Sequence, residues 1–172
     1  QAEGAADVVV TVVGEDHAQE FNRRRQVGPV WISSGRMRFS GVPSLWLVFS
    51  SRAPGSLLPR EVIQQHLLDR ESLLSRVRIE PQPDDPALFR SEYMKRQTKA
   101  GIYGEFPGGV RTQPAGGGVL RYRVDFDWPK AAPPGSYRIH VYAISGREIS
   151  GVSSTPFEVV RIGLPSRISD FS

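Results

Sequence analysis

The hydrophobic residues of this 172-residue chain fall in short runs separated by turns rich in glycine and proline, which predicts a protein built mainly from β-strands. The run DVVVTVVG, residues 7–14, is apolar on both faces, as in a strand covered on both sides. In PSLWLVFSS, residues 43–51, both faces are again apolar, so Trp46 is expected in the core. Trp31 follows Pro29 at a strand edge, where a core position and a partly exposed position are equally expected.

The stretch GRMRFS, residues 35–40, alternates apolar and basic side chains. Met37 and Phe39 fall on one face and Arg36 and Arg38 on the other, because successive side chains of a strand point to opposite faces. This pattern predicts a strand with one buried face and one solvated face.

The last third of the chain predicts a series of antiparallel strands. Residues 118–128, GVLRYRVDFDW, alternate most regularly and predict one strand with an apolar face and a charged face. A strand at about 136–144, a tight turn at Ser145–Gly146 and a closing strand at about 156–162 follow. The predicted apolar face of the first of these strands consists of Leu120, Tyr122, Val124, Phe126 and Trp128.

Two stretches in the middle of the chain have helical spacing instead. The first is predicted as a helix over about 58–69. The second has Asp84 or Asp85 as a candidate N-cap, Pro86 in its first turn and Gly101 after its last turn. Its apolar face is expected to consist of Leu88, Phe89, Tyr93 and Met94.

The order of these elements predicts the fold class. Consecutive antiparallel strands with two helices between them indicate a single mainly β domain over residues 1–172. We expect an antiparallel, immunoglobulin-like β-sandwich with a two-helix insertion at about 56–104.

Charge and composition narrow the classes of function. The net charge is +4, but acidic residues are interspersed among the 22 Lys and Arg residues, which favours a solvated basic surface over a nucleic-acid groove. We therefore expect no nucleic-acid partner.

The chain has no cysteine, which excludes disulfides, thiolate nucleophiles and cysteine-bound metal.

The candidate catalytic groups form no recognisable set. His17, His66 and His140 lie in separate predicted elements and lack metal-binding spacing. Residues 14–20, GEDHAQE, carry carboxylates around His17, but a solvated loop is favoured over a cation site. We expect no catalytic residue, no metal and no cofactor. A hydrolase would need a pocket in which His66 or His140 meets a carboxylate and a hydroxyl group.

Four stretches together resemble a known family. They are DVVVTVVG, VWISSGRMRFSGVPSLWLVFSSR, FRSEYMKRQTKAGIYGE and PPGSYRIHVYAISGREISGVSSTPFEVVRIG, which span most of the chain. They are similar to the alphaproteobacterial putative transmembrane protein family, whose members look like an exported β-rich domain followed by one C-terminal membrane helix.

This resemblance implies a place in the cell and a kind of partner. It implies a domain at the periplasmic face of the bacterial inner membrane, anchored in the full-length protein by a helix beyond a juxtamembrane tail, residues 163–172. It also implies a strand, or a pair of strands, before DVVVTVVG, where this sequence has only six residues, so a first strand is expected to be missing. It further implies a loose association with permeases similar to sulfite exporters. The start QAEGAAD suits the removal of a signal peptide, although an introduced boundary explains it equally. The resemblance implies no reaction.

These observations predict a non-enzymatic interaction domain that docks an envelope or membrane protein, with a sulfite-exporter-like permease as one candidate. The contact surface is expected where turns present aromatic side chains or exposed backbone. The residues expected there are Trp31, the turn of Gly41, Val42 and Pro43, and the segment containing Tyr103, Pro107, Gly108, Gly109 and Val110.

The alternative function is a binding module for an oxyanion or another acidic ligand. Arg36 with Arg38, and Arg121 with Arg123, each project to one side of a predicted strand. Guanidinium groups bind oxyanions through two parallel hydrogen bonds. This alternative requires the four arginines to converge in the fold. A homodimer formed by strand exchange is a further option, because a missing first strand leaves a sheet edge open.

Overall fold

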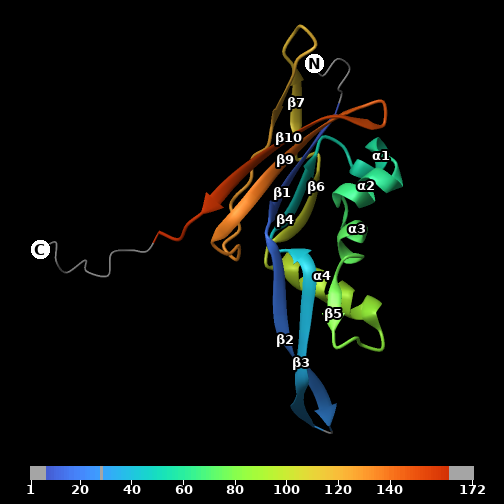
Figure 1. Cartoon of the computed structure of the whole chain (residues 1–172), viewed down its shortest axis with the longest axis vertical. Coiled ribbons are helices and arrows are strands. Elements are labelled where there is room, and N and C mark those ends of the chain that lie inside the picture. The colour runs from blue at the N-terminus through green and yellow to red at the C-terminus, as the bar shows by residue number, and fades with distance from the viewer. Residues whose placement is uncertain (1–6, 28, 163–172) are drawn as a thin grey trace, which may run out of the picture.

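Ten strands of the described residues form three sheets (Figure 1). The computed structural model of the chain describes residues 7–27 and 29–162, and of residues 23–27 and 30–34 it describes the backbone alone. The strands are β1 (Asp7–Gly14), β2 (Asp16–Val27), β3 (Val30–Pro43), β4 (Trp46–Ser50), β5 (Arg78–Glu80), β6 (Tyr103–Pro107), β7 (Arg111–Pro114), β8 (Leu120–Arg123), β9 (Gly135–Ser145) and β10 (Glu148–Val159).

The largest sheet has the strand order β10-β9-β1-β4-β6. Its β4–β6 pair is parallel and its other pairs are antiparallel. β1 is the central strand, and its residues 7–12 are buried, which confirms the strand that the apolar run predicted. Trp46 and its neighbours on β4 are buried as well, so the core position predicted for Trp46 is confirmed.

A long hairpin joins the five-stranded sheet to the three-stranded sheet β2-β3-β5. β1 passes into β2 at Glu15, and β3 passes into β4 through Ser44 and Leu45. The amide of Gly14 donates to the carbonyl oxygen of Leu45 at 2.9 Å, and the amide of Ser44 donates to that of Glu15 at 2.8 Å. The pairing therefore continues across the bend. We call β2 and β3 the arm, which projects away from the larger sheet (Figure 1).

Two predictions about the arm are wrong. Residues 14–20 are not a loop, because most of them belong to β2, where the side chains of Asp16, His17 and Glu20 are exposed. Residues 41–43 are not a turn, because β3 continues through them. Gly41 has a φ of +83°, and a Cβ there would come within 2.8 Å of the carbonyl oxygen of Arg76. The glycine therefore permits a close approach of two backbones inside a strand.

The alternation predicted for β3 is confirmed. Met37 and Phe39 are buried, whereas Arg36 and Arg38 are exposed.

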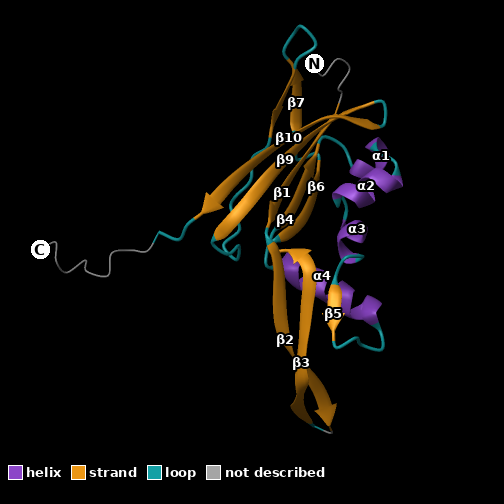
Figure 2. Ribbon diagram, in the orientation of Figure 1, coloured by secondary structure: helices purple, strands orange, loops and turns teal. Residues whose placement is uncertain are grey.

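The helices lie on one side of the sheets in the view of Figure 2. They are α1 (Pro54–Leu57), α2 (Arg60–His66), α3 (Arg70–Leu74) and α4 (Pro86–Lys99). The single helix predicted at about 58–69 is wrong. Leu67 has a φ of +52° and ends α2, and the carboxylate of Asp69 starts α3 by accepting from the amide of Ser72 at 2.9 Å.

The second predicted helix is confirmed as α4. Asp85 is its N-cap and accepts from the amide of Leu88 at 3.2 Å, Pro86 is its first residue, and Gly101 follows its end with a φ of +77°. Tyr93 and Met94 are buried as predicted. Leu88 is 54% exposed, so the prediction that it belongs to the apolar face is wrong.

The strand predicted at residues 118–128 is shorter than expected. β8 ends at Arg123, and residues 124–134 belong to no strand or helix. β9 confirms the strand predicted at about 136–144, and Gly146 and Arg147, both with positive φ, make the tight turn after it. β10 starts at Glu148, well before the predicted residue 156, because it pairs with β9 along almost its whole length.

The two faces of the five-stranded sheet are covered differently. On one face, the indole N–H of Trp46 donates to the carbonyl oxygen of Leu67 at 2.9 Å, beyond the end of α2. On the other face, Phe126 packs on Phe49 and Trp128 packs on Tyr137.

The fold is mainly β, as predicted, with several sheets. An immunoglobulin-like sandwich is not confirmed.

Candidate interaction surface

A buried polar network holds the arm to the larger sheet. The hydroxyl of Tyr103 on β6 donates to the carbonyl oxygen of Pro43 at 2.6 Å, and the hydroxyls of Tyr103 and Tyr93 are 3.2 Å apart. The amide nitrogen of Gln97 donates to the Tyr93 hydroxyl and to the side-chain oxygen of Gln19, both at 3.1 Å. Burial raises the pKa of Tyr103 far above its usual range, so its hydroxyl stays protonated and remains a donor. Tyr103 is therefore a structural residue.

The residues of β3 that were predicted to contact a partner differ in their exposure. Gly41 is exposed, but Val42 and Pro43 are buried, so their side chains are covered by the protein itself. The backbone of Trp31 lies on β3 opposite Gln26. The side chain of Trp31 lies outside the described residues.

The predicted segment near β6 contains both buried and exposed residues. Tyr103 and Val110 are buried and Gly109 is half-buried, whereas Pro107 and Gly108 are exposed. One large hydrophobic side chain of this segment is exposed, and it was not among the residues named from the sequence. It belongs to Phe106, which is 43% exposed.

Phe106 is part of an exposed aromatic cluster. Its ring stacks on the buried ring of Phe49 with centroids 4.9 Å apart and planes 15° apart. Phe126 packs on the same ring at 5.0 Å and is 40% exposed. A ring that is stacked below and open above loses little conformational freedom when another protein covers it. We call Phe106 and Phe126 the aromatic pair.

The hairpin β7–β8 extends beside this pair, because β7 starts shortly after Phe106 and β8 ends shortly before Phe126. Tyr122 on β8 is 48% exposed. Arg111 lies directly opposite Arg123 in the ladder, and Arg121 projects to the same side as Arg123. Like charges directly opposite each other are unfavourable.

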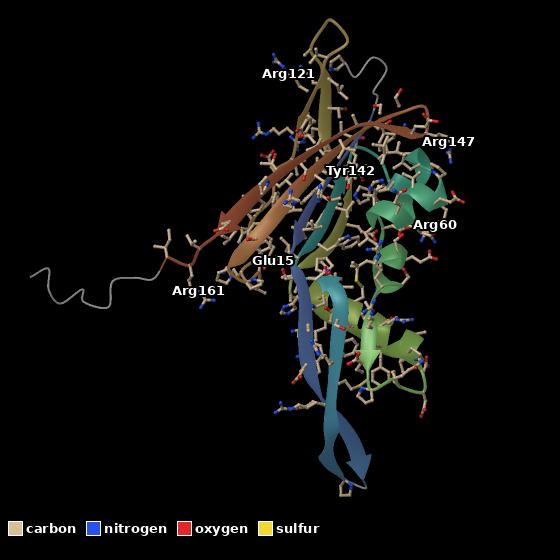
Figure 3. The ribbon with its side chains drawn as sticks, viewed as in Figure 1. Glu15, Arg60, Arg121, Tyr142, Arg147 and Arg161 are labelled. Carbon is tan, nitrogen blue, oxygen red and sulfur yellow. The ribbon has the colours of Figure 1, made fainter. Side chains whose placement is uncertain are left out.

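One of the three arginines on the hairpin is already neutralised. The Nε of Arg123 donates to Asp125 at 2.8 Å. Arg111 and Arg121 form no ion pair with any described residue. Both side chains are exposed, and Figure 3 shows Arg121 at the end of the molecule that β7 and β8 form.

The four arginines of the alternative function do not converge. Arg36 and Arg38 lie on β3 in the three-stranded sheet, and Arg121 and Arg123 lie on β8 in the two-stranded sheet. These sheets are at opposite ends of the molecule (Figure 1). Arg36 is also 3.5 Å from a carboxylate oxygen of Glu20. The prediction of one anion site built from these four residues is therefore wrong.

Two of the three histidines lie beside the same residue of the larger sheet, Tyr142 on β9. The rings of His66 on α2 and His140 on β9 lie 5.2 Å and 6.1 Å from the ring of Tyr142. Burial, followed by the positive charge of Arg138, lowers the pKa of His140. Within the described residues, neither histidine contacts a carboxylate and no three acidic or histidine side chains are grouped as metal ligands. The exposed His17 lies apart from them on β2.

The architecture defines a β-rich domain with two projecting hairpins and a half-exposed aromatic pair at the base of one of them. The chain belongs to the family described as putative transmembrane protein (Alph_Pro_TM), which matches residues 1–172. No helix within the described ranges is long and apolar enough to span a membrane. No curated protein and no solved structure matches the chain.

Proposed function

We propose that this chain is the extracytoplasmic, non-enzymatic docking domain of a membrane-anchored protein. Its partner is an integral membrane protein of the bacterial envelope, with a permease as the leading class. The observation that carries this function is the aromatic pair, because Phe106 and Phe126 stack on buried Phe49 and still expose about two-fifths of their surface. Its membership in a family described as transmembrane supports the membrane association.

The chemistry of the surface specifies the partner's chemistry. Aromatic and arginine side chains are enriched in protein interfaces, where a few of them supply most of the binding energy. The aromatic pair fits an apolar pocket, and Arg111 and Arg121 fit carboxylates beside that pocket. We call the aromatic pair together with Arg111, Arg121 and Tyr122 the docking surface. Its partner therefore presents an apolar pocket bordered by acidic residues.

Pairing through the edge of β10 is less suited to docking. The ladder between β9 and β10 is irregular between Ile149 and Gly151, and Pro156 has no amide proton to offer a further strand. Bulges and prolines are devices that prevent strand addition at sheet edges. A homodimer by strand exchange at this edge is therefore not part of the proposal.

The test is photocrosslinking in intact cells that carry the full-length protein. A photoreactive phenylalanine analogue replaces Phe106, and in a separate strain it replaces Leu88, which is equally exposed but lies on α4. We expect a discrete crosslink to one membrane protein from position 106 and none from position 88. The combined change Arg111→Glu and Arg121→Glu should weaken the position 106 crosslink by about tenfold or more, because it turns attraction into repulsion.

Two outcomes would contradict the proposal. One is a position 106 derivative that crosslinks no membrane protein although the protein is folded and anchored. The other is the same set of crosslinks from both positions, since that pattern indicates random collisions in the envelope.

A further inference from the structure

A groove beside the arm collects arginines from three parts of the chain. It has a volume of about 860 Å³ and lies between the turn after α3, strand β5 and the start of α4. Arg76 comes from the turn, Arg78 from β5 and Arg90 from α4. None of these residues was selected from the sequence, because Arg90 lies on a different element and is distant along the chain from Arg76 and Arg78. We call this the arginine groove.

Arg90 is held in position by the backbone. Its Nε donates to the carbonyl oxygen of Val77 at 3.2 Å, and its side chain is half-buried. A guanidinium group fixed through Nε keeps its two terminal nitrogens, which are the donors that grip an oxyanion in parallel. The fixed group also loses less conformational freedom when a ligand binds than a fully solvated one does.

No carboxylate among the described residues neutralises the three arginines. Elsewhere in the molecule Arg52 holds Asp7 at 2.7 Å and Arg60 holds Asp69. By contrast, none of Arg76, Arg78 and Arg90 takes part in an ion pair of the described chain. The groove therefore presents guanidinium groups whose charge is not matched by an internal partner.

The two acidic residues that border the groove do not cancel this charge. Glu80 lies directly opposite Arg38 in the β3–β5 ladder and forms no ion pair with any described arginine. Asp16 lines the groove without an ion pair to any described arginine. Three arginines and two carboxylates line the groove, so its net charge is positive.

The size and lining of the groove define the ligand class. Its volume is within the range of sites for small organic ligands and larger than one inorganic ion needs. Apolar residues, including Val77, Ile79 and Pro86, line it together with the arginines. We propose that the arginine groove binds a small anion that carries more than one carboxylate or phosphate group. This site is separate from the docking surface, and neither proposal depends on the other.

The test is isothermal titration calorimetry of the purified chain with citrate and with pyrophosphate as probes. We expect the wild-type protein to bind at least one of them. The changes Arg78→Gln and Arg90→Gln, made singly, should each weaken binding about tenfold or more, because each removes a charge-assisted hydrogen-bonding group. The matched control is Arg147→Gln in the turn between β9 and β10, an exposed residue of neither site, which should leave the affinity within about twofold, since a distant exposed charge is largely screened by salt.

Each outcome of these titrations either supports or contradicts anion binding at the groove. Tighter binding of citrate assigns a carboxylate ligand, and tighter binding of pyrophosphate assigns a phosphate ligand. The side chain of Arg78 is exposed and forms no ion pair with a described residue, so its variant remains informative if Arg90→Gln fails to fold. No binding of either probe at millimolar concentration would overturn the proposal. Equal losses in Arg78→Gln and Arg147→Gln would also overturn it, because they would indicate attraction to the overall basic charge.

Discussion

The two hairpins that project from this protein have the same topology but different support. The arm, β2–β3, carries a third strand, β5, on one edge and α4 on one face. Phe39 on β3 stacks on Tyr93 of α4 at 4.9 Å with an interplanar angle of 5°. The β7–β8 hairpin is a two-stranded sheet whose side chains are mostly exposed. The arm is therefore an extension of the core, whereas β7–β8 depends mainly on its own strand pairing.

This difference suits the roles that we assign to the two ends. An isolated two-stranded hairpin has marginal stability in water, so β7–β8 can adjust its position when a partner covers the docking surface. The arm is bonded to α4 and to β6 through the buried tyrosine and glutamine network. The arginine groove lies along this fixed part, where a rigid arrangement of donors favours a small ligand.

The largest expected effect comes from breaking the support of the arm. The change Phe39→Ala removes a buried ring that contacts Tyr93 and Phe21, whose centroid is 5.4 Å away. We expect the free energy of unfolding to fall by about 3–5 kcal/mol, which is typical of a large aromatic residue lost from a core. Denaturant unfolding measures this change. Hydrogen exchange should show faster exchange in residues 16–43 and unchanged exchange in residues 111–123. A loss below about 1 kcal/mol would contradict the view that the arm shares the core.

A smaller effect is expected from one hydroxyl group at the base of the arm. The change Tyr103→Phe removes the donor to the carbonyl oxygen of Pro43 and a partner of the Tyr93 hydroxyl. Groups left buried without a partner cost about 1–3 kcal/mol, and we expect a loss of this size in denaturant unfolding. Because the pKa of Tyr103 is raised in the folded protein, its share of the stability is present at neutral pH and is lost as the pH rises above about 10, where the unfolded chain ionises.

The control for this prediction makes the same chemical change in the other hairpin. Tyr122→Phe removes an exposed hydroxyl on β8 and should change the free energy of unfolding by less than about 0.5 kcal/mol. Equal losses from the two tyrosines would mean that the buried network does not hold the arm.

The sequence predicted the elements whose burial follows from local pattern. The apolar run of β1, the alternation around Met37 and Phe39, and the capped helix α4 all have the predicted positions. The strand predicted over residues 118–128 is too long. The alternation of apolar and charged residues continues past Arg123, but β8 ends there because its partner strand β7 begins opposite it, at Arg111. The length of a strand depends on its partner strand, which the residue pattern of a single segment does not reveal.

The candidate surfaces were harder to predict than the fold. The segment 103–110 was selected for its turn residues, yet Tyr103 and Val110 are buried and the exposed ring is that of Phe106. Which ring is covered depends on Phe49, a residue of another strand. The arginine groove is non-local in the same way, because its members come from a turn, a short strand and a helix. Periodicity describes one element, whereas each of these surfaces is assembled from several.

A substitution at the docking surface should affect stability less than the changes in the arm, and it sharpens the contrast between the hairpins. The change Tyr122→Ser removes an exposed ring opposite Thr112 in the β7–β8 ladder. A cross-strand pair contributes at most about 1 kcal/mol, so denaturant unfolding should change by less than that amount. The same variant should weaken the position 106 crosslink, because the ring contributes to the docking surface. A large loss of stability would show that β7–β8 is as integral to the core as the arm, and the hairpin could then not adjust to a partner independently.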